Sequence, residues 1–97
     1  MNVLITVTWR AGASHTENRA AAQVVQERLM NPFPGVTISH TLADLGKRKL
    51  YIIADVTEHA VNDIRTTLEL TTQSAIESVD IALVVDGKKA INTYLAM

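Results

Sequence analysis

Five side chains in this sequence could bind or act on a small molecule. Trp9 and Arg10 offer a flat apolar indole and a guanidinium that donates hydrogen bonds to an anion or a carbonyl group. His15 and Asn18 follow a few residues later, and His40 stands alone further along the chain. An imidazole titrates near neutral pH, so we expect His40 to act as a general base. We therefore predict a site in which His40 is catalytic and the other four side chains bind the ligand.

The stretch from Thr8 to Asn18 also has a purely structural explanation. Ser14 and Glu17 have the spacing at which a serine caps a helix and a glutamate binds the backbone of the cap. Arg10 can pair with Glu17, and Trp9 can close the end of a core. Capping explains the segment "GASHTEN", but it does not explain the tryptophan and arginine before it.

The composition excludes several classes of chemistry. The chain has no cysteine, so it holds no disulfide, thiolate nucleophile, iron–sulfur cluster or cysteine zinc site. It also has no glycine-rich phosphate loop, no G-x-S-x-G elbow and no H-E-x-x-H helix. Asp55, His59 and Asp63 resemble a metal ligand set, but only the last two can share a helical face. We expect neither a metal nor an organic cofactor.

Charge and hydropathy limit the partners. Nine basic and ten acidic residues give a net charge of −1, which creates no general attraction to nucleic acid or to an anionic membrane. A sheet that binds RNA would stack bases on aromatic residues, and the expected third strand offers only Tyr51. The apolar run at the N-terminus is too short for a secretory signal, and no segment is long enough to span a membrane. We expect a cytoplasmic protein that binds neither nucleic acid nor membranes.

Hydrophobic periodicity divides the chain, which we take as a single domain over residues 1–97. A helix is expected from Ser14 to the prolines of "NPFPGV", and a second from Thr57 or Glu58, with Val61, Ile64 and Leu68 as its apolar stripe. Alternating patterns predict strands over residues 3–9, 36–42, 50–56 and 79–85, with a polar connection at "DLGKRK" and a short C-terminal helix capped by Asp86.

This order predicts a ferredoxin-like α+β fold, βαββαβ, with a four-stranded antiparallel sheet in the order 4-1-3-2 and two helices on one face. The opposite face mixes apolar and polar residues, among them Leu4, Thr6 and Tyr51. A bare face of this kind favours a homodimer through the sheet, with a monomer as the alternative. The helix-facing side collects the expected core residues Val3, Ile5, Val7, Val36, Ile38, Leu50, Ile52, Val79, Ile81 and Leu83.

The same alternation predicts that the candidate site residues converge. The first and second strands run in parallel in this strand order, so Trp9 and Arg10 should lie near the level of His40. His40 and Trp9 also share the parity of the helix-facing side, and the first helix begins at this end with His15 and Asn18. We expect a cleft there for a small organic ligand with an apolar body and an anionic or carbonyl end.

Four segments, "VTWRAGASHTENRAAA", "PGVTISH", "YIIADV" and "VVDGKKAI", resemble in order and spacing a family of small bacterial proteins known only as a domain of unknown function. The most specific pattern is T-W-R-x-G-A-S-x-x-E-N, from Thr8 to Asn18. That family is similar to the dimeric α/β-barrel superfamily, in which two sheets associate and a subunit often keeps a pocket between its sheet and helices. The resemblance implies this fold and a homodimer.

Three functional interpretations fit these residues. The first is a homodimer with a small-molecule pocket, and in some relatives this arrangement serves a cofactor-free monooxygenase or isomerase. The second is a ligand-sensing module similar to the amino-acid-binding ACT domains, which share this topology. The third is a protein-interaction module without enzymatic activity. The sequence leaves the choice among them open.

Overall fold

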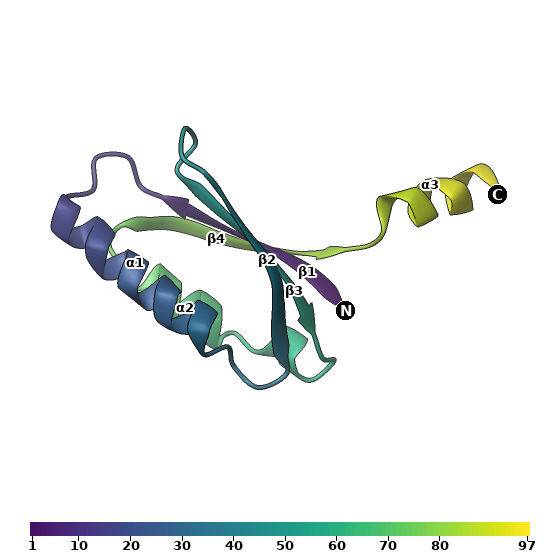
Figure 1. Ribbon diagram of the computed structural model, residues 1–97, viewed down its shortest axis with the longest axis horizontal. Helices are drawn as coiled ribbons and strands as arrows, with labels where there is room; N and C mark the ends of the chain where they lie inside the picture. The colour runs from purple at the N-terminus through teal and green to yellow at the C-terminus, as the bar shows by residue number, and fades with distance from the viewer.

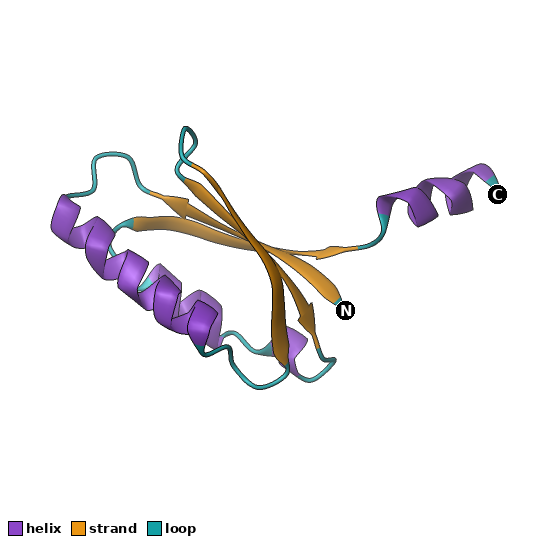
Figure 2. Ribbon diagram, viewed as in Figure 1, coloured by secondary structure: helices purple, strands orange, loops and turns teal.

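The protein forms one antiparallel sheet with two helices packed on one of its faces and a third helix beyond it (Figures 1 and 2). The computed structural model describes residues 1–97, apart from the side chain of Asn62. Its strand order is β2-β3-β1-β4, which confirms the predicted ferredoxin-like fold and strand order. The elements in chain order are β1 Asn2–Trp9, α1 His15–Met30, β2 Val36–Asp44, β3 Lys49–Val56, the 3-10 turn η1 Ala60–Asn62, α2 Arg65–Thr71, β4 Ile76–Val84 and α3 Gly87–Leu95.

Helix α1 begins as the capping pattern predicts. The Ser14 hydroxyl accepts a hydrogen bond from the Glu17 backbone N–H at 3.1 Å, and the Glu17 carboxylate accepts one from the Ser14 N–H, also at 3.1 Å. These two bonds satisfy donors that a helix start leaves free. Ala21 and Val25 are buried on the face that α1 turns toward the core.

The core lies between this helix layer and the two central strands. Alternate residues of β1 and β3 point into it, because side chains of a strand alternate between the two faces of a sheet. The buried apolar residues are Val3, Ile5, Val7, Ala21, Val25, Ile52, Ala54, Val56, Leu70, Ala75 and Ile76. The helices are tied to each other by Arg28, whose guanidinium donates two hydrogen bonds to the Glu69 carboxylate at 3.0 and 3.1 Å.

Helix α2 begins later than the sequence predicts. The segment after β3 forms a turn and η1 instead, and α2 starts only at Arg65. This segment lies close to Gly35, which has a φ of +85°: a Cβ at Gly35 would lie 2.6 Å from the Thr57 hydroxyl. One reason for the later start is Asp63, whose carboxylate accepts a hydrogen bond from the Arg65 N–H at 2.9 Å. Consequently Ile64 and the α2 residue Leu68 are exposed rather than part of a buried stripe.

The short α2 leaves the end of β4 uncovered. Ile81 and Leu83 pair in register with the buried Ile5 and Val3, as expected, yet 49% and 65% of their surfaces are exposed. Seven helical residues extend about 10 Å, whereas the nine residues of β4 extend about 30 Å. The prediction that these two residues belong to the core is therefore wrong.

A β-bulge changes the orientation of β2 residues after Ile38. Ile38 pairs with Ala54, but the next paired residue is His40, opposite Ile53, so the register shifts by one residue at Ser39. A one-residue shift moves the following side chains to the other face of a sheet. His40 and Leu42 thus lie on the open face, and not on the helix-facing side that simple alternation predicts.

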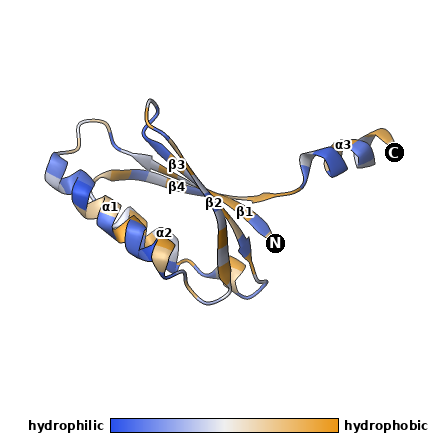
Figure 3. Ribbon diagram, viewed as in Figure 1, coloured by the Kyte–Doolittle hydropathy of each residue, from blue (hydrophilic) through white to orange (hydrophobic). Residues whose placement is uncertain are grey.

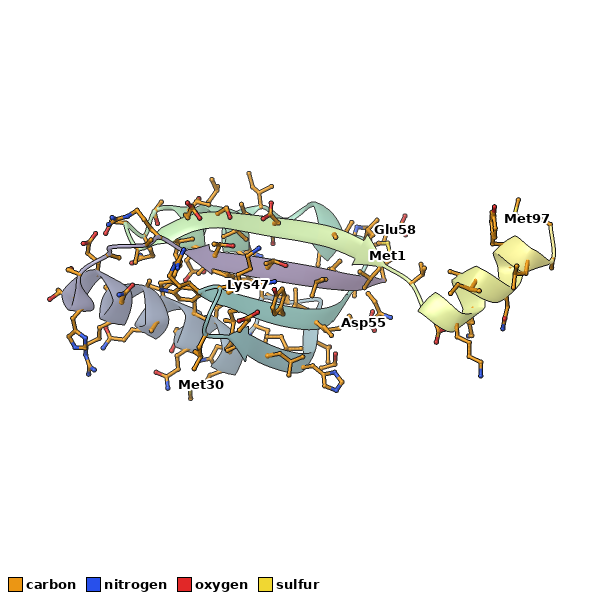
Figure 4. The ribbon with its side chains drawn as sticks, turned by 90° about the horizontal axis from the view of Figure 1, so that it is seen from above. Met1, Met30, Lys47, Asp55, Glu58 and Met97 are labelled. Carbon is orange, nitrogen blue, oxygen red and sulfur yellow. The ribbon has the colours of Figure 1, made fainter. Side chains whose placement is uncertain are left out.

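Helix α3 stands apart from the rest of the fold. Asp86 caps it as predicted, with its carboxylate accepting a hydrogen bond from the Lys89 N–H at 2.9 Å, but none of its residues is buried. The view from above shows it extending past the end of the sheet, with Met97 at the far tip (Figure 4). The radius of gyration is 15.0 Å, whereas a compact domain of this length would have about 12.5 Å. The molecule is elongated because of this helix.

Candidate functional site

A cavity of about 410 Å³ opens at the end of β1, where the β1–α1 loop faces the β2–β3 hairpin. It contains three of the five predicted site residues, Trp9, Arg10 and Asn18. The full set of lining residues is Trp9, Arg10, Gly12, Ala13, Asn18, Ala43, Asp44, Leu45, Arg48, Lys49 and Leu50. Part of the predicted cleft therefore exists, but its second wall is the hairpin and not the middle of β2.

Backbone hydrogen bonds hold the end of β1 between the β2–β3 hairpin and the segment before β4. The Trp9 N–H donates to the Arg48 carbonyl of the hairpin at 2.8 Å. The Arg10 N–H donates to the Ala75 carbonyl, just before β4, at 2.7 Å. The register with β4 also shifts between Thr8 and Trp9. The half-buried indole packs against the core and, together with Leu50, contributes to the apolar part of the cavity wall.

Arg10 has structural partners at the cavity edge. Its Nη2 donates to the Glu17 carboxylate at 2.9 Å, and its Nε donates to the Ser74 carbonyl at 3.1 Å. The Ser74 hydroxyl also donates to Glu17, at 2.6 Å. Hydrogen bonds from Ser74 and Ser14, with a smaller effect of the Arg10 charge, lower the pKa of Glu17 from 4.5 to about 2. The expected pairing of Arg10 with Glu17 is thus present, and it fixes the guanidinium beside the cavity.

The other two predicted ligand-binding residues differ in position. Asn18 lines the cavity, and its side-chain amide donates to the Ala13 carbonyl at 3.3 Å, which steadies the β1–α1 loop. His15 is the first residue of α1, is exposed, and does not line the cavity. The helix start therefore contributes one of its two candidate side chains to the site.

The structure corrects the expected position of His40. Its strand partner Ile53 is level with Leu4 of β1, five residues before Trp9, which is about 16 Å along the strand. The bulge at Ser39 also places the imidazole on the open face, where its Nδ1 lies 3.3 Å from the Ser39 hydroxyl. His40 and Trp9 thus lie on different faces of the sheet, and a ligand in the cavity is out of reach of the imidazole.

Arg48 and Lys49 are cavity residues that the sequence did not predict. They belong to the segment "DLGKRK", which has the composition of an ordinary polar connection. In the structure β2 and β3 continue to Asp44 and from Lys49, so this segment is a tight hairpin level with the end of β1. A prediction that extended the second strand to Asp44 would have placed the hairpin, and with it Arg48, beside Trp9.

The acidic and histidine residues do not assemble into a metal site. Within the described part of the chain, no group of three or more histidine and acidic side chains could hold a metal ion. Asp55 instead pairs with the N-terminal amino group at 3.0 Å, and Asp63 pairs with Arg65. Among the described residues, no helix combines the length and the apolar character that crossing a membrane requires.

Comparison with known proteins shows similarity at the level of structure. No protein-family model matches the chain, and no curated protein matches it either. A solved structure of the chemotaxis kinase CheA P2 domain, in complex with the response regulator CheY from the thermophile Thermotoga maritima, is similar with a TM-score of 0.51. The sequence identity is 14%, and the match covers 86% of this chain and 96% of the other. At this identity the similarity establishes the α+β fold.

Proposed function

We propose that this chain is a protein-interaction module that docks through its C-terminal apolar surface, and that a second copy of the chain is its partner. Exposed large apolar residues carry this proposal. They begin in β4, where Figure 3 colours the strand end as hydrophobic, and continue into α3. We define the C-terminal apolar surface as Ile81, Leu83, Val85, Ile91, Tyr94, Leu95 and Met97, whose exposed fractions run from 49% to 95%.

Helix α3 needs a partner to be stable. It has nine residues, none of them buried, and an isolated helix shorter than about 12–15 residues is marginal in water. Ile91, Tyr94 and Leu95 follow the spacing that puts side chains on one helical face. Burying such a face against apolar surface supplies the stability that the helix lacks by itself.

The surface that fits this helix is present on the same chain. Ile81 and Leu83 face the helix layer of the sheet, but α2 stops short of them. The chain's own α3 extends away from the sheet and leaves this strip bare (Figures 1 and 4). Each copy therefore has one unsupported helix and one uncovered strip of sheet. In a dimer with a two-fold axis, the α3 of each copy can pack on the uncovered strip of the other copy.

The structural neighbour supports the general class of function. In that structure a domain of the same fold is in complex with a folded protein, the response regulator. A homodimer through the open sheet face, as expected from the sequence, has weaker support. Leu42 on that face is exposed, but Leu4, Tyr51 and Ile53 are already half-buried within one chain, so this face has less apolar area left to bury than the C-terminal surface. An enzyme with His40 as its base is weakly supported too, because the imidazole lies far from the cavity.

The test is the mass of the protein in solution, measured by analytical ultracentrifugation over a wide concentration range. We expect the wild-type chain to form dimers and Ile91→Lys to be monomeric, because the substitution puts a charge in the centre of the apolar helical face. Asn92→Lys is the matched control, since it adds the same charge to α3 at an exposed residue outside the C-terminal apolar surface, and this variant should still dimerise. A wild-type chain that stays monomeric at high concentration would contradict the second copy as partner.

A further inference from the structure

We propose that the cavity beside Trp9 binds a small aromatic carboxylate, a planar ring that carries one negatively charged group. This inference goes beyond the protein-interaction function, because the cavity lies at the opposite end of the sheet from α3. Trp9 ends β1, whereas the last residue of β4, Val84, pairs with Asn2 at the start of β1. The two sites can therefore be tested separately.

The apolar part of the cavity suits a ring. The indole of Trp9 and the side chain of Leu50 are half-buried at the edge of the core, and each contributes to the wall. Aromatic rings pack favourably against such a surface in offset or edge-on arrangements. A volume of about 410 Å³ is large enough for a single small molecule and falls within the range of small-molecule pockets. An extended peptide would need a longer groove or a strand edge.

The charges around the cavity favour an anion. Arg10, Arg48 and Lys49 line it against one carboxylate, Asp44, although the whole chain has a net charge of −1. The Arg10 guanidinium is occupied by Glu17 and the Ser74 carbonyl.

One cation remains to bind a ligand. Lys49 pairs in register with Thr8 and Asp44, so its side chain lies on the open face, opposite to that of Leu50. Among the described residues, Arg48 forms no salt bridge. Asp44 accepts a hydrogen bond from the Lys47 N–H at 3.2 Å and so helps to close the hairpin. The single positive charge of Arg48 matches a monoanion, because a guanidinium donates charge-assisted hydrogen bonds to carboxylate oxygens.

The experiment uses the single tryptophan of the chain. Because Trp9 has the only indole N–H, its NMR signal reports on the cavity without ambiguity. We expect a saturable shift of this signal on titration with 3-phenylpropanoate at neutral pH. The neutral analogue 3-phenylpropanamide tests the charge and should bind several-fold more weakly, and acetate tests the ring and should give no saturable shift.

A variant tests the assignment of the cation. Arg48→Gln should weaken the binding of 3-phenylpropanoate by about fivefold, the upper range for a solvent-exposed ion pair. Lys89→Gln is the matched control, because Lys89 lies on α3 at the other end of the molecule and its loss should leave the affinity unchanged. The Ile91→Lys variant should also bind normally, since its defect is in association.

Three results would overturn the proposal. One is the absence of a saturable shift with 3-phenylpropanoate at about 10 mM, a concentration that would detect millimolar affinity. Another is equal affinity for the acid and the amide, which would remove the role of charge. The third is the same loss of affinity in Lys89→Gln as in Arg48→Gln. None of these results depends on whether the chain dimerises.

Discussion

At the scale of single residues, Glu17 connects three parts of the chain. Its carboxylate accepts hydrogen bonds from the Ser14 N–H at the start of α1, from the Arg10 guanidinium after β1, and from the Ser74 hydroxyl before β4. One ionised side chain thus ties the β1–α1 loop, which borders the cavity, to the segment before β4. This explains why Arg10, which sequence reasoning assigned to ligand binding, has a structural role as well.

Glu17 should make the stability of the protein depend on pH. Its pKa is lowered to about 2 in the folded state from an ordinary value of 4.5. Between these values the unfolded chain binds a proton that the folded chain does not, so stability is fully present above pH 4.5 and falls as the pH drops toward 2. Urea unfolding at a series of pH values should show a smaller fall for Glu17→Gln than for the wild type.

Ser74→Ala tests which hydrogen bond causes this pH dependence. The Ser74 hydrogen bond contributes most to the lowered pKa of Glu17, so its removal should bring the pKa closer to 4.5 and reduce the pH dependence in part. Parallel stability profiles for the wild type and Glu17→Gln would show that the pKa of Glu17 is the same in the folded and unfolded chains, contrary to the observed hydrogen bonds.

At the scale of elements, α1 and α3 have similar caps but different surroundings. Ser14 and Asp86 each accept a hydrogen bond from a backbone N–H in the first turn of their helix. Helix α1 then buries Ala21 and Val25, whereas α3 buries nothing. The same local chemistry therefore supports a structural helix in one place and an unsupported one in the other.

Removing the two caps should have different results. Ser14→Ala should lower the free energy of unfolding by about 0.5–2 kcal/mol, as cap substitutions do in packed helices. Asp86→Ala should leave it unchanged in dilute, monomeric protein and instead reduce the helical content of residues 87–95, measured by backbone NMR chemical shifts. Equal loss of global stability in both variants would mean that α3 packs on its own domain in solution.

At the scale of the whole molecule, the elongated shape separates two regions with different properties. The domain of residues 1–84 contains the core and the cavity, and α3 projects beyond it (Figure 1). Along its three principal axes the molecule measures 52, 31 and 18 Å. We assign association to the projecting end and ligand binding to the cavity at the opposite end of the sheet.

Truncation after Val85 should remove α3 with little effect on folding. Because the helix buries no residue, the free energy of unfolding of the truncated chain should match that of the monomeric full-length chain within about 0.5 kcal/mol.

Ile52→Ala serves as a comparison in the core. It removes only part of one side chain, but this side chain is 6% exposed, so the substitution should lower the free energy of unfolding by about 2–5 kcal/mol. Both values follow from denaturant unfolding monitored by circular dichroism. A large loss on truncation would contradict the independence of the domain.

The sequence alone determined the features that depend on neighbouring residues. The capping box at Ser14, the alternation of β1 and the cap at Asp86 are local patterns, and each forms as predicted. The order of the elements then leaves few topologies open, so the ferredoxin-like fold and its strand order also follow from the sequence. Trp9, Arg10 and Asn18 could be placed near one another because they flank the same short connection between β1 and α1.

Only the tertiary structure decided the features that depend on distant contacts. The bulge at Ser39 turns His40 to the open face, and the extended hairpin brings Arg48 to Trp9 in its place. The approach of the Thr57 segment to Gly35 accompanies a shorter α2, which leaves Leu83 and its neighbours bare. Strand register and helix length are set by packing against segments far away in the chain, and a single-residue shift is enough to move a side chain to the opposite face.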